Sequence, residues 1–425
     1  MSQTITKILI SLGSFKDIFS PKESCEMIRD IVSRAGWNDF SPEIKCISIA
    51  DGGEYSSNVI SEYCNAERIL LTDIINPYKE NVASEYFILD NDTAFIASSD
   101  ILRILPEFDH FKNPLNLTSY GLGQLINDAI NRGFKRIIIG LGGTNTVDGG
   151  IGMAQALGVT FLDKNNKELA PIDGKYYSGS DLKNIQSIVI DDSLSSKFSE
   201  ISIEALCDGR IPLVQMHIPN NQKIGEKYNS DRESINNMIQ LGIEKYSDVI
   251  NNYLINNCKR DKEELSIKDL EYFGVAGGIN LSLNAIFNTK MKPGIDFFIN
   301  ELDVESEIKK SDLIITGEGR LDNSLAGKTP IGISRIAKKY NKPVLYLTGD
   351  VIDSLKKYFD GSISRDLPLA LKDSGVSTVI SCHNSYVNQV MPDDVINKNK
   401  IYRENTPMIF NKAITKYFFE NEYIK

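Results

Sequence analysis

The chain has 425 residues, of which 41% are hydrophobic and 24% charged, so it can bury a sizeable core and wholesale disorder is excluded. Its 47 Lys and Arg against 57 Asp and Glu give a net charge of −10. This charge argues against a protein that binds nucleic acid or an anionic membrane, because attraction to phosphate needs a basic surface.

The cysteines and histidines argue against two common kinds of active site. Six cysteines are scattered without a CxxC pair, and only three histidines are present. These counts disfavour a zinc site and a Ser-His-Asp triad, and they fit free thiols in a reducing compartment. The N-terminus lacks a signal-peptide pattern and no apolar run reaches about 18 residues, so we expect a cytoplasmic protein that does not enter a membrane.

The N-terminal part alternates between strand and helix. Residues 6–12 form an apolar run that ends at Gly13-Ser14, which predicts a buried strand entering a loop. Ser20-Pro21-Lys22-Glu23 is a capping box with proline at the first helical position, so we expect a helix to begin there. Residues 44–50 predict a second strand, which stops at Asp51-Gly52-Gly53-Glu54. Strand, helix and strand in this order indicate a parallel sheet.

The same pattern returns later in the chain. Three further apolar runs each end at a glycine, and small-residue or capped segments follow two of them. The expected strands cover 136–141, 312–316 and 343–348, and the expected helices cover 151–157 and 329–340.

Two polar stretches interrupt or follow these elements. Residues 219–235 are poor in aliphatic side chains and predict a surface loop that leads into a helix. Residues 384–405 contain many Asn, Asp and Lys and predict a long loop near the C-terminus.

Neither of the two common phosphate-binding signatures is complete. A Walker A loop needs a glycine five positions before its Gly-Lys-Thr, but Gly327-Lys328-Thr329 is preceded there by Asp322. A dinucleotide fingerprint fails as well, because its third glycine is replaced by Asn145 in one candidate and by Gln155 in the other. The glycine-rich loops therefore need another explanation.

Four loops share one design, in which glycines mix with acidic, basic or hydroxyl residues directly after an apolar strand. They are Gly13–Lys16, Asp51–Glu54, Gly142–Gly150 and Gly317–Lys328. Ligands of open α/β sheets bind beyond the carboxyl ends of the strands, where backbone N–H groups suit a phosphate. We expect these loops to converge on one anionic pocket, although each could also be an ordinary turn. Its carboxylates could hold Mg²⁺ or act as a base, and its cations could neutralise phosphate, as phosphoryl transfer requires.

At this point the sequence resembles the bacterial glycerate kinases of the glycerate 2-kinase type, whose motifs occur here in the family's order over nearly the whole chain. The matching segments are Ser14-Phe15-Lys16, Ala50–Glu54, Asn113–Leu115 with Thr118–Gly123, Gly142–Thr144 with Asp148–Gly158, Cys207-Asp208, Ala276–Gly278, Pro293–Asp296, and Thr316–Asp322 with Gly327–Gly332.

The resemblance implies an α/β enzyme of two α/β domains. Residues 1–80 and 285–425 would form a Rossmann-like parallel sheet built from both chain ends, and residues 81–284 would form a second domain inserted between them. The strand–loop–helix pattern at both ends agrees with this discontinuous domain. ATP with Mg²⁺ would phosphorylate D-glycerate in the cleft, to a phosphoglycerate that is usually the 2-phosphate. The implied partners are the hydroxy acid and the nucleotide, and a homodimer is left open.

The resemblance and the loop chemistry together assign roles to sixteen residues. The catalytic candidates are Lys16, Asp51, Asp148 and Asp322; the substrate or phosphate ligands are Ser14, Gly52, Gly53, Gly142, Gly143, Thr144, Asp208, Gly277, Gly278, Glu318, Arg320 and Lys328; and the metal ligands are Asp51, Asp148 and Glu318. Alternatives stay open for several of these residues. Lys16 could be a solvated loop lysine and Asp51 could cap its own turn. Glu318, Arg320 and Asp322 could form a surface ion-pair cluster. Asp148 could cap the helix over 151–157, and Asp208 could have a structural role.

The chain also departs from the motifs of the family it resembles. The altered positions are Gly13, Asp17, Ala97, Gln124, Val147, Arg210 and Ile211. An aliphatic residue cannot replace a hydrogen-bond partner of a ligand, and each lost contact costs about 1–3 kcal/mol. Three interpretations follow: a diverged glycerate kinase, a kinase for another small hydroxylated metabolite, or a relative without catalysis. The second would be supported if Ala97, Val147 and Ile211 lined one pocket.

Overall fold

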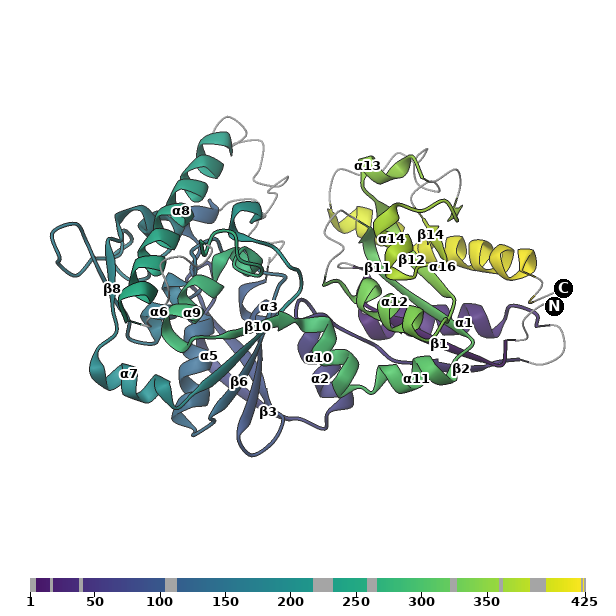
Figure 1. Cartoon of the computed structure of the whole chain (residues 1–425), viewed down its shortest axis with the longest axis horizontal. Coiled ribbons are helices and arrows are strands. Elements are labelled where there is room, and N and C mark those ends of the chain that lie inside the picture. Colours follow the sequence, from purple (N-terminus) through teal and green to yellow (C-terminus); the bar gives the residue numbers. More distant parts are fainter. Residues whose placement is uncertain are drawn as a thin grey trace. The chain divides into compact units, whose positions relative to one another are not determined.

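The protein is a mixed α/β chain with two six-stranded sheets, seen here in a computed structural model (Figure 1). The structure describes residues 5–15, 18–37, 41–103, 113–216, 232–257, 266–321, 327–358, 362–382, 395–421 and 423. The chain divides into two compact units. Unit 1 contains residues 1–51 and 295–425, and unit 2 contains residues 52–294.

The sheet of unit 1 is built from both ends of the chain, as the sequence predicts. Its strand order is β13-β14-β12-β11-β1-β2, and every neighbouring pair is parallel except β13 with β14. β1 lies in the interior of this sheet, where Ile8 pairs with Leu313 of β11 and with Ile44 of β2. The strands are β1 (Lys7–Leu12), β2 (Glu43–Cys46), β11 (Leu313–Leu321), β12 (Val344–Val351), β13 (Ile363–Ser364) and β14 (Thr378–Ser381).

Helices cover the sheet of unit 1. The two ends of the chain meet again here, because helix α1 packs against helix α16 (Figure 1). The Phe15 and Phe410 rings make an edge contact at 5.7 Å. The capping box at Ser20 is present, with Glu23 Oε2 accepting from the Ser20 N–H at 2.8 Å. The helices are α1 (Pro21–Ser33), α10 (Gly294–Glu301), α11 (Val304–Lys310), α12 (Thr329–Lys339), α13 (Asp353–Lys356), α14 (Leu369–Ser374) and α16 (Val395–Glu420).

The sheet of unit 2 is mixed. Its order is β10-β9-β6-β5-β4-β3, and the four strands from β10 to β5 are parallel while β4 and β3 are antiparallel. The strands are β3 (Glu67–Ile75), β4 (Asn81–Ile88), β5 (Thr93–Ala97), β6 (Arg136–Leu141), β9 (Ser202–Cys207) and β10 (Lys290–Pro293), and β7 (Thr160–Leu162) pairs with β8 (Ser187–Val189) in a small separate sheet.

Two apolar clusters form the core of unit 2. One lies between the sheet and helices such as α5, and includes Leu122, Ile137 and Leu283. The other gathers around α8 and includes Val147, Phe161 and Ile243. The helices are α2 (Ser56–Tyr63), α3 (Ser98–Leu102), α5 (Tyr120–Asn131), α6 (Ile151–Ala156), α7 (Asp192–Ser199), α8 (Arg232–Asn257) and α9 (Asn280–Phe287), with short 3-10 turns at Pro114–Asn116, Gly179–Asn184, Leu213–Gln215 and Val275–Gly278.

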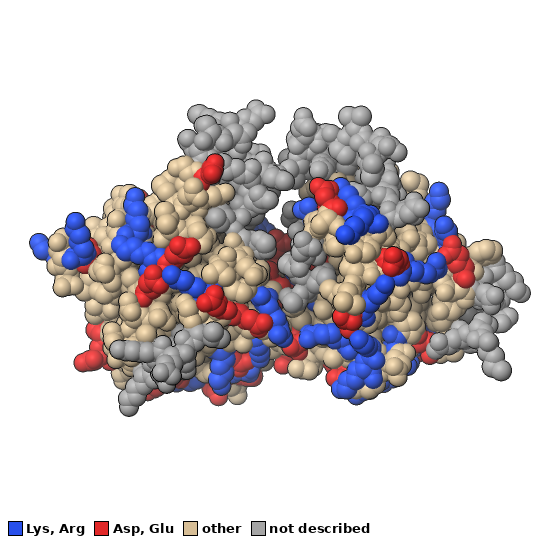
Figure 2. Space-filling model, turned by 45° about the horizontal axis from the view of Figure 1, so that its top comes forward, with Lys and Arg blue, Asp and Glu red and all other residues tan. Residues whose placement is uncertain are grey.

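Charged side chains pair locally. On the face shown in Figure 2, Lys and Arg are interspersed with Asp and Glu. In unit 2, for example, Glu204 pairs with Arg136 at 2.8 Å and with Lys292 at 2.5 Å. In the described part of the chain, no helix is both long and apolar enough to cross a membrane.

Three expectations about the elements need correction. The second strand ends at Cys46, although the Ile47 and Ile49 N–H groups still donate to β1 carbonyls. Residues 395–405 are helical and not part of a long loop, because Tyr402 and later apolar residues of α16 pack on the core of unit 1. Residues 52–80 and 285–294, which we expected in the first domain, lie in unit 2, because β3 pairs with β4 and β10 pairs with β9.

Candidate active site

The carboxyl edge of the unit 1 sheet brings two of the predicted loops together. The Gly13 N–H donates to the Gly317 carbonyl at 3.2 Å, and the Gly319 N–H donates to the Ser14 carbonyl at 3.1 Å. We expected Gly317–Arg320 to be a loop, but these residues extend strand β11 and stay paired with β12 up to Leu321. The glycines permit this extension, since a side chain at Gly317 would meet the Leu347 carbonyl oxygen at 2.2 Å.

Polar side chains follow one another along this extension. Glu318 is partly exposed and accepts a hydrogen bond from the buried Tyr346 hydroxyl, at 2.6 Å. Two residues on, Arg320 is exposed and its Nε lies 3.6 Å from Asp350 Oδ2 on the neighbouring strand. A carboxylate and a guanidinium are therefore held at the carboxyl edge of unit 1.

Two further candidates in the described part of the chain belong to the same unit. Lys328 directly precedes α12, and the next residue, Thr329, lies against the loop after β1, 3.6 Å from where a Gly13 side chain would begin. Asp51 is partly exposed and is the last residue of the N-terminal part of unit 1. Lys16 and Asp322 lie outside the described residues.

The carboxyl edge of the unit 2 sheet brings a second set of candidates together. Gly52 has a φ of +97°, and a side chain there would meet the Leu206 carbonyl oxygen at 2.3 Å, so only glycine lets this turn sit directly on β9. A side chain at Gly142 would meet Asp208 Oδ2 at 2.3 Å. Gly143 in turn lies against the Glu54 side chain. The turn after Asp51, the loop after β6 and the residue after β9 therefore meet.

Only the beginning of the loop after β6 is accessible. Gly143 and Thr144 are partly exposed, whereas residues 145–150 are buried. Gly277 and Gly278 contact the buried part, with the Gly149 N–H donating to the Gly277 carbonyl at 3.1 Å. Their contacts in the described structure are thus with the backbone of this loop.

Asp148 is completely buried, and donors occupy both of its carboxylate oxygens. Oδ2 accepts from the Ser119 N–H and hydroxyl, both at 2.8 Å, and from the Gly152 N–H at 3.3 Å, while Oδ1 accepts from the Gly150 N–H at 3.0 Å. Burial raises the pKa of Asp148, and these hydrogen bonds oppose the rise. The geometry favours the interpretation that Asp148 caps the first turn of α6 and anchors the loop.

One acidic residue at this edge was missed by the sequence interpretation. Asp100 lies in α3, directly after β5, and accepts a hydrogen bond from the Ser57 hydroxyl of α2. Burial raises its pKa to about 6. No glycine-rich motif marks this position, and the Ser-Ser-Asp run after an apolar strand is the only signal that could have found it.

The departures from the family motifs lie in different surroundings. Val147 is fully buried in the cluster around α8, whereas Ile211 packs against the cluster between sheet and helices. Ala97 is buried at the end of β5, and Arg210 lies 3.6 Å from Glu271. Val147 and Ile211 thus pack in separate apolar clusters and do not line one pocket. The hypothesis of a kinase with a changed acceptor therefore lacks this support.

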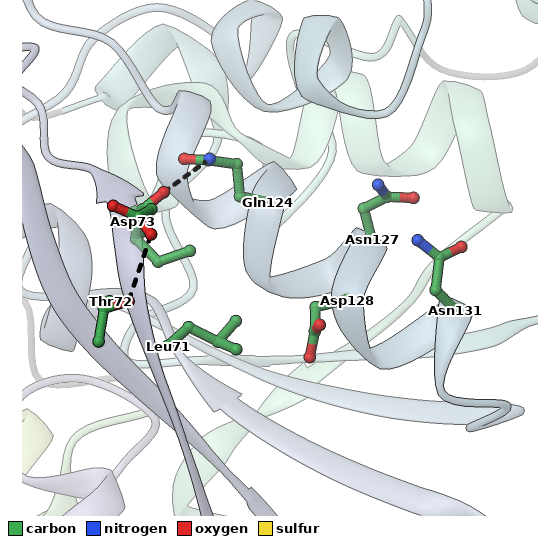
Figure 3. Close-up of a pocket in the computed structure, with 8 residues that line it drawn as sticks. Leu71, Thr72, Asp73, Gln124, Asn127, Asp128 and Asn131 are labelled. Atoms are coloured by element: carbon green, nitrogen blue, oxygen red, sulfur yellow. Dashed lines mark hydrogen bonds between the residues drawn. The ribbon is translucent and has the colours of Figure 1, made fainter.

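A shallow polar groove lies between β3 and α5, away from the predicted residues. Its volume is about 360 Å³, and Asn127, Asp128 and Asn131 of α5 line one side (Figure 3). Gln124, also on α5, bridges to the irregular end of β3: its Nε2 donates to the Asp73 carbonyl at 3.1 Å, and its Oε1 accepts from the Ile75 N–H at 2.8 Å. None of the candidate site residues lines this groove.

The candidate carboxylates differ in whether their oxygens could bind Mg²⁺. In the described ranges, no three His, Cys, Asp or Glu side chains gather into a metal cluster. Mg²⁺ commonly takes one or two carboxylates and keeps water and phosphate oxygens as its other ligands. Asp148 does not fit, because N–H and O–H donors already occupy its oxygens. Asp51 and Glu318 are partly exposed and adjoin glycines in the sequence, and they have the donor chemistry that fits.

An α/β fold with glycine and carboxylate clusters at the carboxyl edges of two sheets is typical of phosphotransferases. A model of the family described as "Glycerate kinase family" matches residues 8–393, and the chain belongs to this family. It is therefore a kinase, a phosphotransferase with an alcohol group as acceptor. The resemblance found in the sequence motifs is confirmed.

Curated relatives and a solved structure support the same assignment. The chain is 32% identical to the glycerate 2-kinase of Escherichia coli K12, over 82% of this chain and 86% of the relative. It is also 32% identical to the glycerate kinase of Bacillus subtilis 168, over 81% and 85%. A crystal structure described as a candidate glycerate kinase 2 from Salmonella typhimurium LT2 covers 99% of this chain and is itself covered completely, with a TM-score of 0.64 and 26% identity.

Proposed function

We propose that the protein transfers the γ-phosphoryl group of ATP to a hydroxyl of D-glycerate, and that the product is 2-phosphoglycerate. The observation that carries this proposal is the meeting of three chain segments at the carboxyl edge of unit 2: Gly52–Glu54, Gly142–Thr144 and Asp208. Glycines there allow a charged ligand to approach the backbone N–H groups closely. The similarity to a named glycerate 2-kinase supports the acceptor and the phosphorylated position.

The cations of unit 1 have the chemistry to hold anionic oxygens. In the proposal, Lys16, Arg320 and Lys328 neutralise phosphate or carboxylate, and Ser14 contributes a backbone contact or its hydroxyl. Arg320 is exposed at the strand end, so its guanidinium can form paired hydrogen bonds to such a group.

The carboxylates divide between metal binding and proton transfer. Asp51 and Glu318 would hold Mg²⁺, which when bound neutralises the charge of the phosphates. Asp322 or Asp51 would accept the proton of the attacking hydroxyl, and Asp208 would orient the ligand beside Gly142. Asp148 supports the loop after β6, because its oxygens are already hydrogen-bonded.

A coupled assay of ADP release with ATP, Mg²⁺ and D-glycerate tests the proposal, with phosphorus NMR to identify the phosphorylated position. We expect turnover and a 2-phosphate product, and parallel reactions with other small hydroxy acids establish the acceptor.

Arg320→Ala should lower kcat/KM roughly 10- to 100-fold through the lost charge-assisted hydrogen bonds. Arg335→Ala is the matched control, since Arg335 is an exposed arginine of the same unit that pairs with Asp296. Absence of ADP release with D-glycerate would refute the proposal.

A further inference from the structure

Helix α3 contacts both glycine loops of unit 2. It begins directly after β5, and the Ser99 hydroxyl donates to the Gly53 carbonyl at 3.4 Å. At its other end, the Leu102 carbonyl accepts from the Asn145 N–H at 2.9 Å. The turn at 52–54 and the loop after β6 are therefore connected through this one short helix.

Asp100 links α3 to the helix that follows the glycine turn. Its Oδ2 accepts from the hydroxyl of Ser57, which is buried in the first turn of α2. The preceding residue, Ser56, donates through its hydroxyl to the Gly53 carbonyl at 2.7 Å. Two adjacent serines therefore connect the beginning of α2 on one side to Asp100 and on the other to the glycine turn.

Few charged groups face Asp100. Glu85 on β4 raises its pKa and Arg103, just after α3, lowers it, while burial is the largest cause of the rise. The Ser57 hydrogen bond lowers the pKa again, since it favours the ionised form. Asp100 is therefore a partly buried carboxylate whose charge is stabilised mainly by one hydroxyl.

We infer that Asp100 is a positioning residue: its carboxylate holds Ser57, and through α2 it keeps the 52–54 turn in place against the loop after β6. The inference rests on the proposed function, because it gives this turn a part in ligand binding. When Asp100 is protonated, its carboxyl group is neutral and no longer accepts a charge-assisted hydrogen bond from Ser57. The hydrogen bond that positions the 52–54 turn is then weaker. The enzyme with an ionised Asp100 is then the more active form.

The pH dependence of kcat and of kcat/KM tests this role in the full-length enzyme. The wild-type profile should fall on the acidic side with an apparent pKa near 6. Asp100→Asn should remove that limb and lower the plateau of kcat roughly 10-fold, since small misplacements of binding groups are costly. Ser57→Ala should also remove the limb, because Asp100 acts on the turn through the Ser57 hydroxyl.

Asp128→Asn is the matched control. Asp128 is another carboxylate of unit 2 that accepts from a buried hydroxyl, that of Tyr86 at 2.8 Å, but it lies on α5 beside the polar groove. Its substitution should leave the limb near pH 6 unchanged. An Asp100→Asn enzyme that keeps this limb would overturn the inference.

A second readout separates this inference from the proposed function. Amide hydrogen exchange of residues 52–63 without substrate should be faster in Asp100→Asn than in wild type at pH 7.5, and equal in the Asp128 variant. This comparison needs no turnover, so it remains informative if D-glycerate is not the acceptor. Equal exchange in all three proteins would also overturn the inference.

Discussion

The side-chain amide of Gln124 explains one departure from a family motif. Its amide both donates to the Asp73 carbonyl and accepts from the Ile75 N–H, across the register shift in β3. The motif of the family that the sequence resembles has Glu at this position. A carboxylate can accept hydrogen bonds but cannot donate at neutral pH, so it could not make both contacts.

Gln124→Glu should lower the free energy of unfolding of unit 2 by about 1–2 kcal/mol at pH 7, because the Asp73 carbonyl loses its donor. Chemical denaturation or local amide exchange around β3 measures the change. Part of the loss should return near pH 4, where a protonated Glu can donate again. Asn127→Asp, in the same helix and groove, is the control. An unchanged free energy of unfolding at pH 7 would contradict this account.

Gly142 is a position of the candidate site that has no space for a side chain. A side chain there would overlap Asp208 Oδ2, so Gly142→Ala should displace either the loop or the carboxylate. We expect kcat/KM to fall at least about 10-fold while the protein stays folded. Gly209→Ala is the matched control, since its added carbon would lie 3.4 Å from the Ile211 side chain, an ordinary contact distance. Equal activities of the two variants would show that Asp208 is not needed.

At the scale of elements, the beginning of α1 was predictable from four residues. Ser20 and Glu23 exchange hydrogen bonds and Pro21 starts the helix, all within one turn of chain. Ser20→Ala should lower the free energy of unfolding of unit 1 by about 1 kcal/mol, and Ser33→Ala at the other end should change it by a few tenths. Urea denaturation measures both, and equal effects would contradict the capping argument.

The strand ends were harder to predict than the helix starts. Glycines at 317 and 319 suggested a loop, but they allow β11 to continue against β12. The polar composition of 395–405 suggested a loop as well, yet apolar side chains further along α16 pack on unit 1 and the helix extends through this region. In both cases contacts with distant residues outweighed the local composition.

At the scale of the whole molecule, the two units differ in how their chain is connected. Unit 2 is one continuous segment with two apolar clusters of its own, whereas unit 1 needs both chain ends because β1 lies between β11 and β2. A fragment of residues 52–294 should therefore fold alone, with cooperative thermal unfolding by circular dichroism. A fragment of residues 295–425 should not, since it lacks an interior strand. Folding of both or neither would contradict this division.

The sequence by itself determined the class of fold, the discontinuous sheet and the family, because strand periodicity, helix caps and motif order are local properties of the chain. The tertiary structure decided which residues of the glycine-rich loops face outward. Asp148 is buried and accepts hydrogen bonds from Ser119, and Asp100 is connected to the glycine turn through its hydrogen bond from Ser57. Each of these partners is about 30 or 40 residues away along the chain, and packing of the whole unit is what brings them within hydrogen-bond distance.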